Sequence, residues 1–163
     1  MAFSSNTLTL PEDIQIYFTD SGPPPSSTDY TTAIFIHGSS FNGRSFEGLH
    51  AHAHSHNLRI VIITRREYKG STPLFDWELD DLQHGRKAFL DRMGAQLAQF
   101  IQQFVQMETS TIPKIGRDGK TGGIAVVGWS FGAIYALAMF SVPDLVNQSF
   151  LKDYIKDLVL YGK

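Results

Sequence analysis

The sequence has no cysteine, no long hydrophobic run and no cluster of basic residues. Without cysteine it has no disulfide framework, no cysteine-ligated zinc site and no cysteine nucleophile. No run approaches the ~18 consecutive apolar residues of a membrane-spanning helix; the longest candidate is residues 133–140. Lys and Arg number 14 against 16 Asp and Glu, so we expect no nucleic-acid surface. Residues 1–10 are polar and unlike a signal peptide, which favours a cytoplasmic protein.

The length and composition favour one folded domain. With 42% hydrophobic and 12% aromatic residues, a chain of 163 residues can bury a sizeable core. We therefore expect a single domain over residues 1–163. A core of this size needs no metal ion to stabilise it, and we expect no cofactor.

Short apolar runs alternate with helical patterns from residue 33 onward. Two strands are expected before that point, and the second of them alternates between apolar and polar residues. The later runs lack alternation, as strands buried on both faces do. The expected strands are residues 7–10, 14–19, 33–36, 58–63, 123–127 and 158–161. The expected helices are residues 44–57, 80–107 and 131–140. This order predicts an α/β fold with a doubly wound, mostly parallel sheet.

The strongest motif is Gly128-Trp129-Ser130-Phe131-Gly132, which matches the pattern G-x-S-x-G. An apolar strand precedes it and an apolar helix follows it, as this pattern requires. Ser130 would turn sharply between the two in a strained backbone conformation. Such a turn leaves no room for side chains two residues away, which explains Gly128 and Gly132. The alternative is a tight strand–helix junction without chemistry.

A second motif follows the strand at residues 33–36, where His37-Gly38-Ser39-Ser40 begins a loop. Alone, this run is typical of an ordinary strand–helix turn. In folds with a serine elbow, however, the oxyanion hole pairs the N–H after the nucleophile with one from such an earlier loop.

At this point the chain resembles the α/β-hydrolase fold superfamily, as a serine hydrolase of the AB hydrolase-1, fungal-like type. Residues 65–73 add to the likeness, because an arginine-rich loop with a Gly-Ser/Thr pattern follows the fourth strand in many members. The resemblance implies that Ser130 is the nucleophile and that the N–H groups of Phe131 and Ser39, or alternatively Ser40, form the oxyanion hole. The implied pocket residues are His37, Gly38, Ser40 and Trp129. The implied substrate is a small ester or related acyl compound; an elbow aspartate would imply epoxide or haloalkane chemistry instead.

The chain departs from the family pattern after Ser130. In the family, the triad acid follows the seventh strand and the histidine follows the eighth. Residues 158–161 correspond to the sixth strand, and no histidine follows Ser130. We therefore expect a fold that is truncated after this strand and lacks its last strands and helices. A catalytically silent fragment or a ligand-binding module remains an alternative to an active hydrolase.

Six histidines precede the elbow, and two of them are candidate replacements for the missing base. His37 ends a strand at the edge of the sheet where Ser130 lies, although a role in bracing its loop is favoured. His84 is expected early in a helix that begins at that edge. The alternating histidines at 50, 52, 54 and 56 have a chelating i, i+4 spacing, but no carboxylate completes a site, so we expect no metal ion.

Two further expectations concern packing. The pair Arg65-Arg66 is interpreted as structural rather than as an anion site. The strand at residues 158–161 would present an unpaired apolar edge, which predicts self-association through it.

Overall fold

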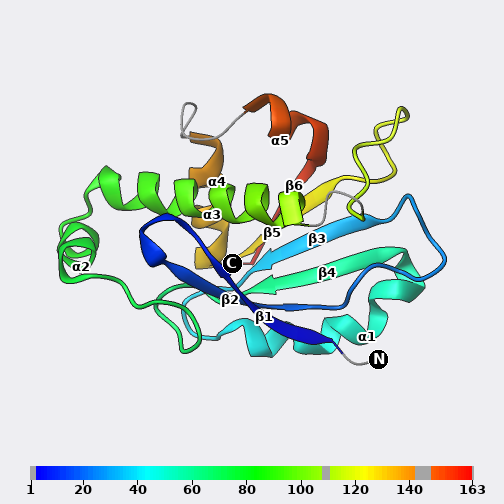
Figure 1. Ribbon diagram of the computed structural model, residues 1–163. Helices are drawn as coiled ribbons and strands as arrows, with labels where there is room; N and C mark the ends of the chain where they lie inside the picture. Colours follow the sequence, from blue (N-terminus) through cyan, green and yellow to red (C-terminus); the bar gives the residue numbers. More distant parts are fainter. Residues whose placement is uncertain (1–2, 108–110, 142–147, 163) are drawn as a thin grey trace.

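Helices cover a six-stranded sheet in the computed structural model of the chain (Figure 1), which describes residues 3–107, 111–141 and 148–162. The strands are β1 Ser4–Thr9, β2 Gln15–Asp20, β3 Thr31–Ile36, β4 Leu58–Ile63, β5 Ile124–Trp129 and β6 Ile155–Tyr161. The α-helices are α1 His50–Ala53, α2 Asp76–Gln83, α3 Lys87–Met107, α4 Phe131–Ser141 and α5 Gln148–Tyr154. Short 3₁₀ helices span Pro11–Asp13, Gly43–Leu49 and His54–His56.

The strand order in the sheet is β1-β2-β4-β3-β5-β6. The first two strands form an antiparallel pair, and β2 joins β4 antiparallel. The remaining four strands run parallel, with Ile36 at the end of β3 opposite Gly128 near the end of β5. The predicted doubly wound, mostly parallel sheet is thus confirmed, and its carboxyl edge brings the loop after β3 beside the turn after β5.

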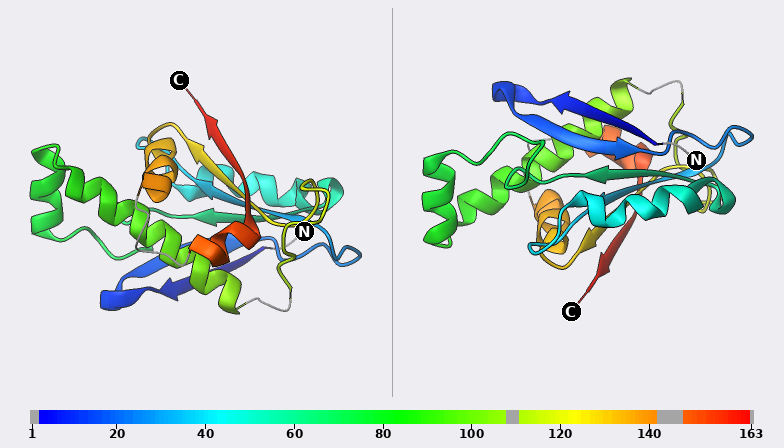
Figure 2. Two further views of the ribbon diagram at one scale, coloured as in Figure 1. Left: turned by 90° about the horizontal axis from the view of Figure 1, so that it is seen from above. Right: turned by 90° about the horizontal axis from the view of Figure 1, so that it is seen from below.

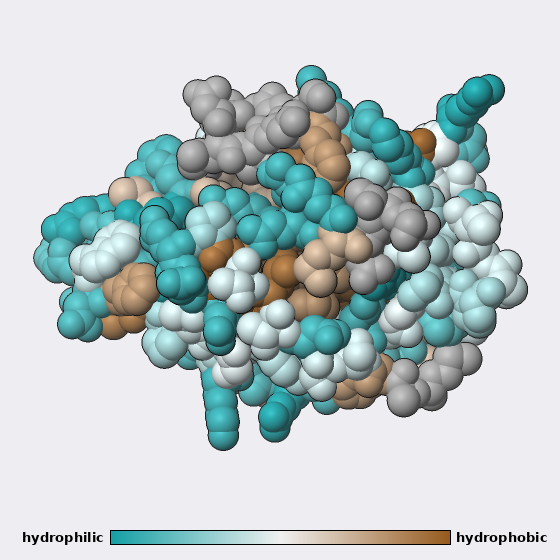
Figure 3. Space-filling view, viewed as in Figure 1, coloured by the Kyte–Doolittle hydropathy of each residue, from teal (hydrophilic) through white to brown (hydrophobic). Residues whose placement is uncertain are grey.

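Successive residues of the central strands pack on opposite faces of the sheet. Ile34, Val61 and Val126 are fully buried in the larger core, which lies beneath α3 and α4. Ala33 and Ile62 belong to a smaller core beside α1 and the preceding 3₁₀ helix. The helices on the two faces can be followed in Figure 2. Figure 3 shows hydrophobic surface between α3 and the β1–β2 pair, on a face that is otherwise mostly hydrophilic.

Two helix predictions were wrong in detail, and one helix was not predicted. The helix expected over residues 80–107 is two helices, because Gly85 adopts φ +61° and ends the first of them. The helix expected over residues 44–57 is a series of short 3₁₀ and α-helical turns. Helix α5 lies where none was expected, directly before β6. No helix in the described part of the chain is long and apolar enough to cross a membrane.

Candidate active site

Ser130 lies at the single-residue turn between β5 and α4, with φ 54°. This left-handed conformation is costly for any residue with a side chain, and the motif predicts it. The Ser130 N–H donates to the carbonyl oxygen of Tyr161 at 2.8 Å, and the Ser130 carbonyl accepts from Ala133 N–H at 2.9 Å. The strained turn is therefore held by β6 on one side and by the first turn of α4 on the other.

The two elbow glycines have no space for a side chain. A Cβ on Gly128 would lie 2.6 Å from Ala133 Cα. A Cβ on Gly132 would lie 2.7 Å from the carbonyl oxygen of His37 and closer still to that of Ile36. Both values are below any normal carbon contact, so the expected steric reason for these glycines is confirmed. Gly132 also brings the start of α4 directly against the end of β3.

The loop after β3 lies against Ser130. A Cβ on Gly38 would be 2.9 Å from Ser130 Cβ, so only glycine allows this approach. Ser39 and Ser40 follow it and are exposed. Phe131 is the first residue of α4, and the first N–H groups of a helix have no partner within that helix. Phe131 therefore follows the half-buried Ser130 directly, and the Ser39–Ser40 segment follows the glycine that packs against it.

His37 is fully buried, and both of its ring nitrogens are engaged by the backbone. Its Nε2 accepts from Arg65 N–H at 3.0 Å, which leaves Nδ1 as the protonated atom that donates to Gly38 O at 2.8 Å. Burial lowers the pKa of His37, with a smaller opposing effect from the Gly38 hydrogen bond. A neutral imidazole in this tautomer braces its loop, as favoured above, and has no free nitrogen to accept a proton from Ser130.

The other histidines do not meet the elbow. His84 caps the carboxyl end of α2, where its Nδ1 lies 2.9 Å from Asp80 O, so the prediction that it lies early in a helix is wrong. Helix α2 lies at one end of the molecule in every view, away from α4 (Figures 1 and 2). Residues 50–56 precede the amino end of β4, at the opposite edge of the sheet.

The histidine run is structural where it is buried. His50 lies 2.9 Å from Thr19 Oγ1 through Nε2, and burial lowers its pKa. His54 lies 3.2 Å from Gly22 O through Nε2. The described residues contain no group of three or more potential ligands that could hold a metal ion.

Arg65 connects the loop after β4 to the elbow, which the sequence did not suggest. Its buried guanidinium lies 4.9 Å from the ring of Phe131 and 4.8 Å from that of Tyr135. Glu67 pairs with it at 3.3 Å and accepts from the Tyr135 hydroxyl at 2.7 Å. Burial, and then the Glu67 carboxylate, raise the pKa of Tyr135 far above its usual range. Arg65 is therefore a packed, paired residue rather than an open anion site.

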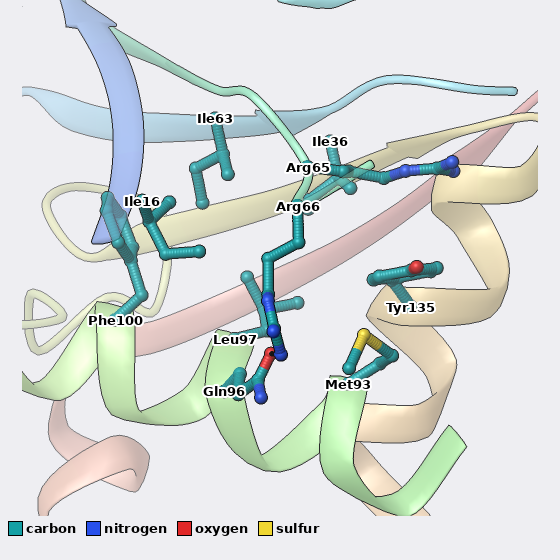
Figure 4. Close-up of a pocket in the computed structure, with 10 residues that line it drawn as sticks. All are labelled: Ile16, Ile36, Ile63, Arg65, Arg66, Met93, Gln96, Leu97, Phe100 and Tyr135. Carbon is teal, nitrogen blue, oxygen red and sulfur yellow. Dashed lines mark hydrogen bonds between the residues drawn. The ribbon is translucent and has the colours of Figure 1, made fainter. Parts of the chain in front are cut away.

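Arg66 is buried on the other side of the same loop. It donates to Glu78 Oε1 at 2.7 Å, to Pro73 O at 2.8 Å and to Thr72 O at 3.2 Å. These bonds use most of its donors and agree with the structural interpretation of the pair. In Figure 4, Arg66 extends toward Gln96 of α3, whereas Arg65 extends toward α4.

The cavity in Figure 4 has a volume of about 40 Å³ and lies beneath these arginines. Its lining is Ile16, Ile36, Ile63, Arg65, Arg66, Met93, Gln96, Leu97, Phe100 and Tyr135. Ser130 is not among these residues, so this small, mainly apolar space is a gap in the core and not the site of the elbow chemistry.

Trp129 projects to the face of the sheet away from α4. Its ring centroid lies 5.4 Å from that of Phe46 and 5.9 Å from that of Phe41, which is 54% exposed. Trp129 thus packs against aromatic residues that follow β3, on the face of the sheet opposite to α4.

The fold of the chain is similar to that of several solved structures. The thioesterase domain from the curacin biosynthetic pathway superposes with a TM-score of 0.61 at 21% identity, over 98% of this chain and 46% of that one. An epoxide hydrolase from Vigna radiata gives 0.58 at 14% identity, over 99% and 40%. A bromoperoxidase from Bacillus anthracis gives 0.55 at 18% identity, over 96% and 44%. The chain spans less than half the length of these structures.

A comparison with curated proteins finds no match. The family model described as "Alpha/beta hydrolase family" matches residues 33–160, which include the strand before His37, the elbow and most of β6. The chain therefore belongs to the alpha/beta hydrolase family.

Proposed function

We propose that the chain carries the nucleophile and oxyanion hole of a serine hydrolase that acts on an ester or a related acyl compound. Ser130 attacks the acyl carbon, and the developing oxyanion accepts hydrogen bonds from the N–H groups of Phe131 and Ser39. The observation that carries the proposal is the left-handed Ser130 with the Gly38 loop packed against it. Backbone donors fixed around a developing negative charge are a large source of rate enhancement in acyl transfer.

The residue type at the elbow favours acyl transfer over epoxide opening. Epoxide hydrolases are among the structural neighbours, but likeness at 14% identity concerns the fold alone. The Ser130 oxygen bonds to the acyl carbon while the bond to the alcohol or thiol breaks, and that group leaves with the hydroxyl proton. Water then hydrolyses the acyl-enzyme to the acid and restores the Ser130 hydroxyl. The substrate class we propose is therefore the acyl compounds, including esters and thioesters.

No histidine among the described residues has a ring nitrogen placed to take the Ser130 proton. His37 uses both nitrogens on the backbone, and the others lie elsewhere. We therefore expect slow turnover by residues 1–163 alone.

The test is p-nitrophenyl acetate hydrolysis by the chain and by Ser130→Ala. We expect a low rate that falls to the solution background in the variant. An unchanged rate in Ser130→Ala would overturn the proposal. A rate at background in both proteins would favour a silent or ligand-binding role.

A further inference from the structure

Tyr68 lies in the segment that follows β4 and contacts the loop after β3, which contains Gly38, Ser39 and Ser40. Its hydroxyl donates a hydrogen bond to the carbonyl oxygen of Ser39. The preceding carbonyl, that of Gly38, accepts from His37 Nδ1 at 2.8 Å. Both peptide units that flank the Ser39 Cα are therefore held by donors on aromatic side chains.

These two bonds set the direction of the N–H groups. A peptide unit is planar and trans, so a fixed carbonyl also fixes the N–H on its opposite side. The Gly38 carbonyl shares its unit with Ser39 N–H, and the Ser39 carbonyl shares its unit with Ser40 N–H. Because Ser39 and Ser40 are exposed, packing orients them little. Hydrogen bonds from His37 and Tyr68 orient them instead.

The Tyr68 ring is itself held in place. It lies edge-on to the His37 ring, with centroids 4.6 Å apart at 88°, and Arg65 lies 5.4 Å from its centroid. The backbone N–H of Arg65 binds His37, and its guanidinium lies over Phe131. One short segment after β4 thus contacts both halves of the proposed oxyanion hole.

We propose that Tyr68 is a positioning residue that fixes the N–H groups of Ser39 and Ser40 for the oxyanion, with Arg65 holding Tyr68 against them. The inference rests on the proposed function of Ser130. An oxyanion forms only as the acyl carbon becomes tetrahedral, so loosening the donors lowers kcat and leaves KM nearly unchanged.

The experiment compares Tyr68→Phe with Tyr30→Phe in the full chain. Tyr30 is also a tyrosine that donates to a backbone carbonyl, that of Thr111, but it lies before β3 at the amino edge of the sheet. With p-nitrophenyl acetate, Tyr68→Phe should lower kcat about tenfold, less than the loss of a whole donor, with KM within about twofold. Tyr30→Phe should change neither quantity.

The outcomes separate this inference from the proposed function. If Ser130→Ala abolishes hydrolysis while Tyr68→Phe retains the parent kcat, the proposed function stands and the positioning role is wrong. A rise in KM alone would also overturn that role, because it would indicate that Tyr68 contacts the substrate instead. Hydrolysis that survives Ser130→Ala overturns the proposed function, and the inference with it.

Discussion

Strands β5 and β6 are hydrogen-bonded neighbours that each contain an apolar run, yet they lie in different environments. Val126 of β5 is fully buried beneath the helices, whereas its partner in the ladder, Leu158 of β6, is 37% exposed. Further along, Val159 is 44% and Tyr161 is 70% exposed. An apolar run therefore predicts a strand but not the layers that cover it. The site needs both strands, because the Tyr161 carbonyl binds Ser130 N–H.

The largest effect on stability is expected at the end of β5, where the elbow meets α4. Gly132→Val places a branched side chain against the carbonyls at the end of β3. We expect a loss of about 3 kcal/mol or more in the free energy of unfolding, measured by urea denaturation. Gly48→Val is the control, since a Cβ there has no atom within 4 Å. Equal urea midpoints for the two variants would show that the elbow is not tightly packed.

Replacing a valine by alanine in each of the two strands measures how far their burial differs. Val126→Ala removes fully buried methyl groups and should cost about 2 kcal/mol. Val159→Ala removes groups that are 44% exposed and should cost less than about 0.5 kcal/mol. Urea unfolding of both variants measures the difference. Equal losses would mean that β6 is covered in solution.

Titratable side chains extend the contrast between buried and exposed positions. Burial lowers the pKa values of His37 and His50. Near and below pH 6.5 these two histidines bind protons more readily in the unfolded chain than in the folded one. The free energy of unfolding therefore falls as the pH decreases from 7.5 to 5.5. Each histidine contributes at most about 1.4 kcal/mol per pH unit. In urea titrations at several pH values, His50→Gln should make the free energy of unfolding less dependent on pH. The control, His52→Gln at an exposed position, should leave that dependence unchanged. The same pH dependence in both variants would show that His50 does not contribute to it.

Val159→Lys is expected to change the free energy of unfolding least. Its main expected effect is to reduce association between copies of the chain. Both faces of β6 carry exposed apolar side chains, and its outer edge has no strand partner among the described residues. Such an edge pairs readily with another chain. We predict that the chain forms oligomers at micromolar concentration by light scattering, and that Val159→Lys reduces them. A monodisperse parent of 18.2 kDa would contradict the prediction.

Short sequence motifs and apolar patterns predicted the backbone of the site, but they did not predict side-chain contacts between segments far apart in the sequence. The G-x-S-x-G spacing predicted the strained Ser130, and the apolar runs predicted the mostly parallel strands whose carboxyl edge brings Gly38 beside it. Tyr68 was missed because its hydrogen bond to Ser39 joins loops far apart in sequence and depends on how each one closes. The break at Gly85 was missed because the apolar spacing continues across it. The position of His84 was wrong for the same reason.

The central claim is that Ser130 is a nucleophile served by backbone donors, and covalent labelling tests it most directly. The chain is treated with a fluorophosphonate probe, digested and analysed by mass spectrometry, with Ser130→Ala in parallel. The account predicts a phosphonyl adduct on the peptide that contains Ser130, and no adduct in the variant. An unlabelled Ser130 under conditions that modify another serine equally in both proteins would contradict it.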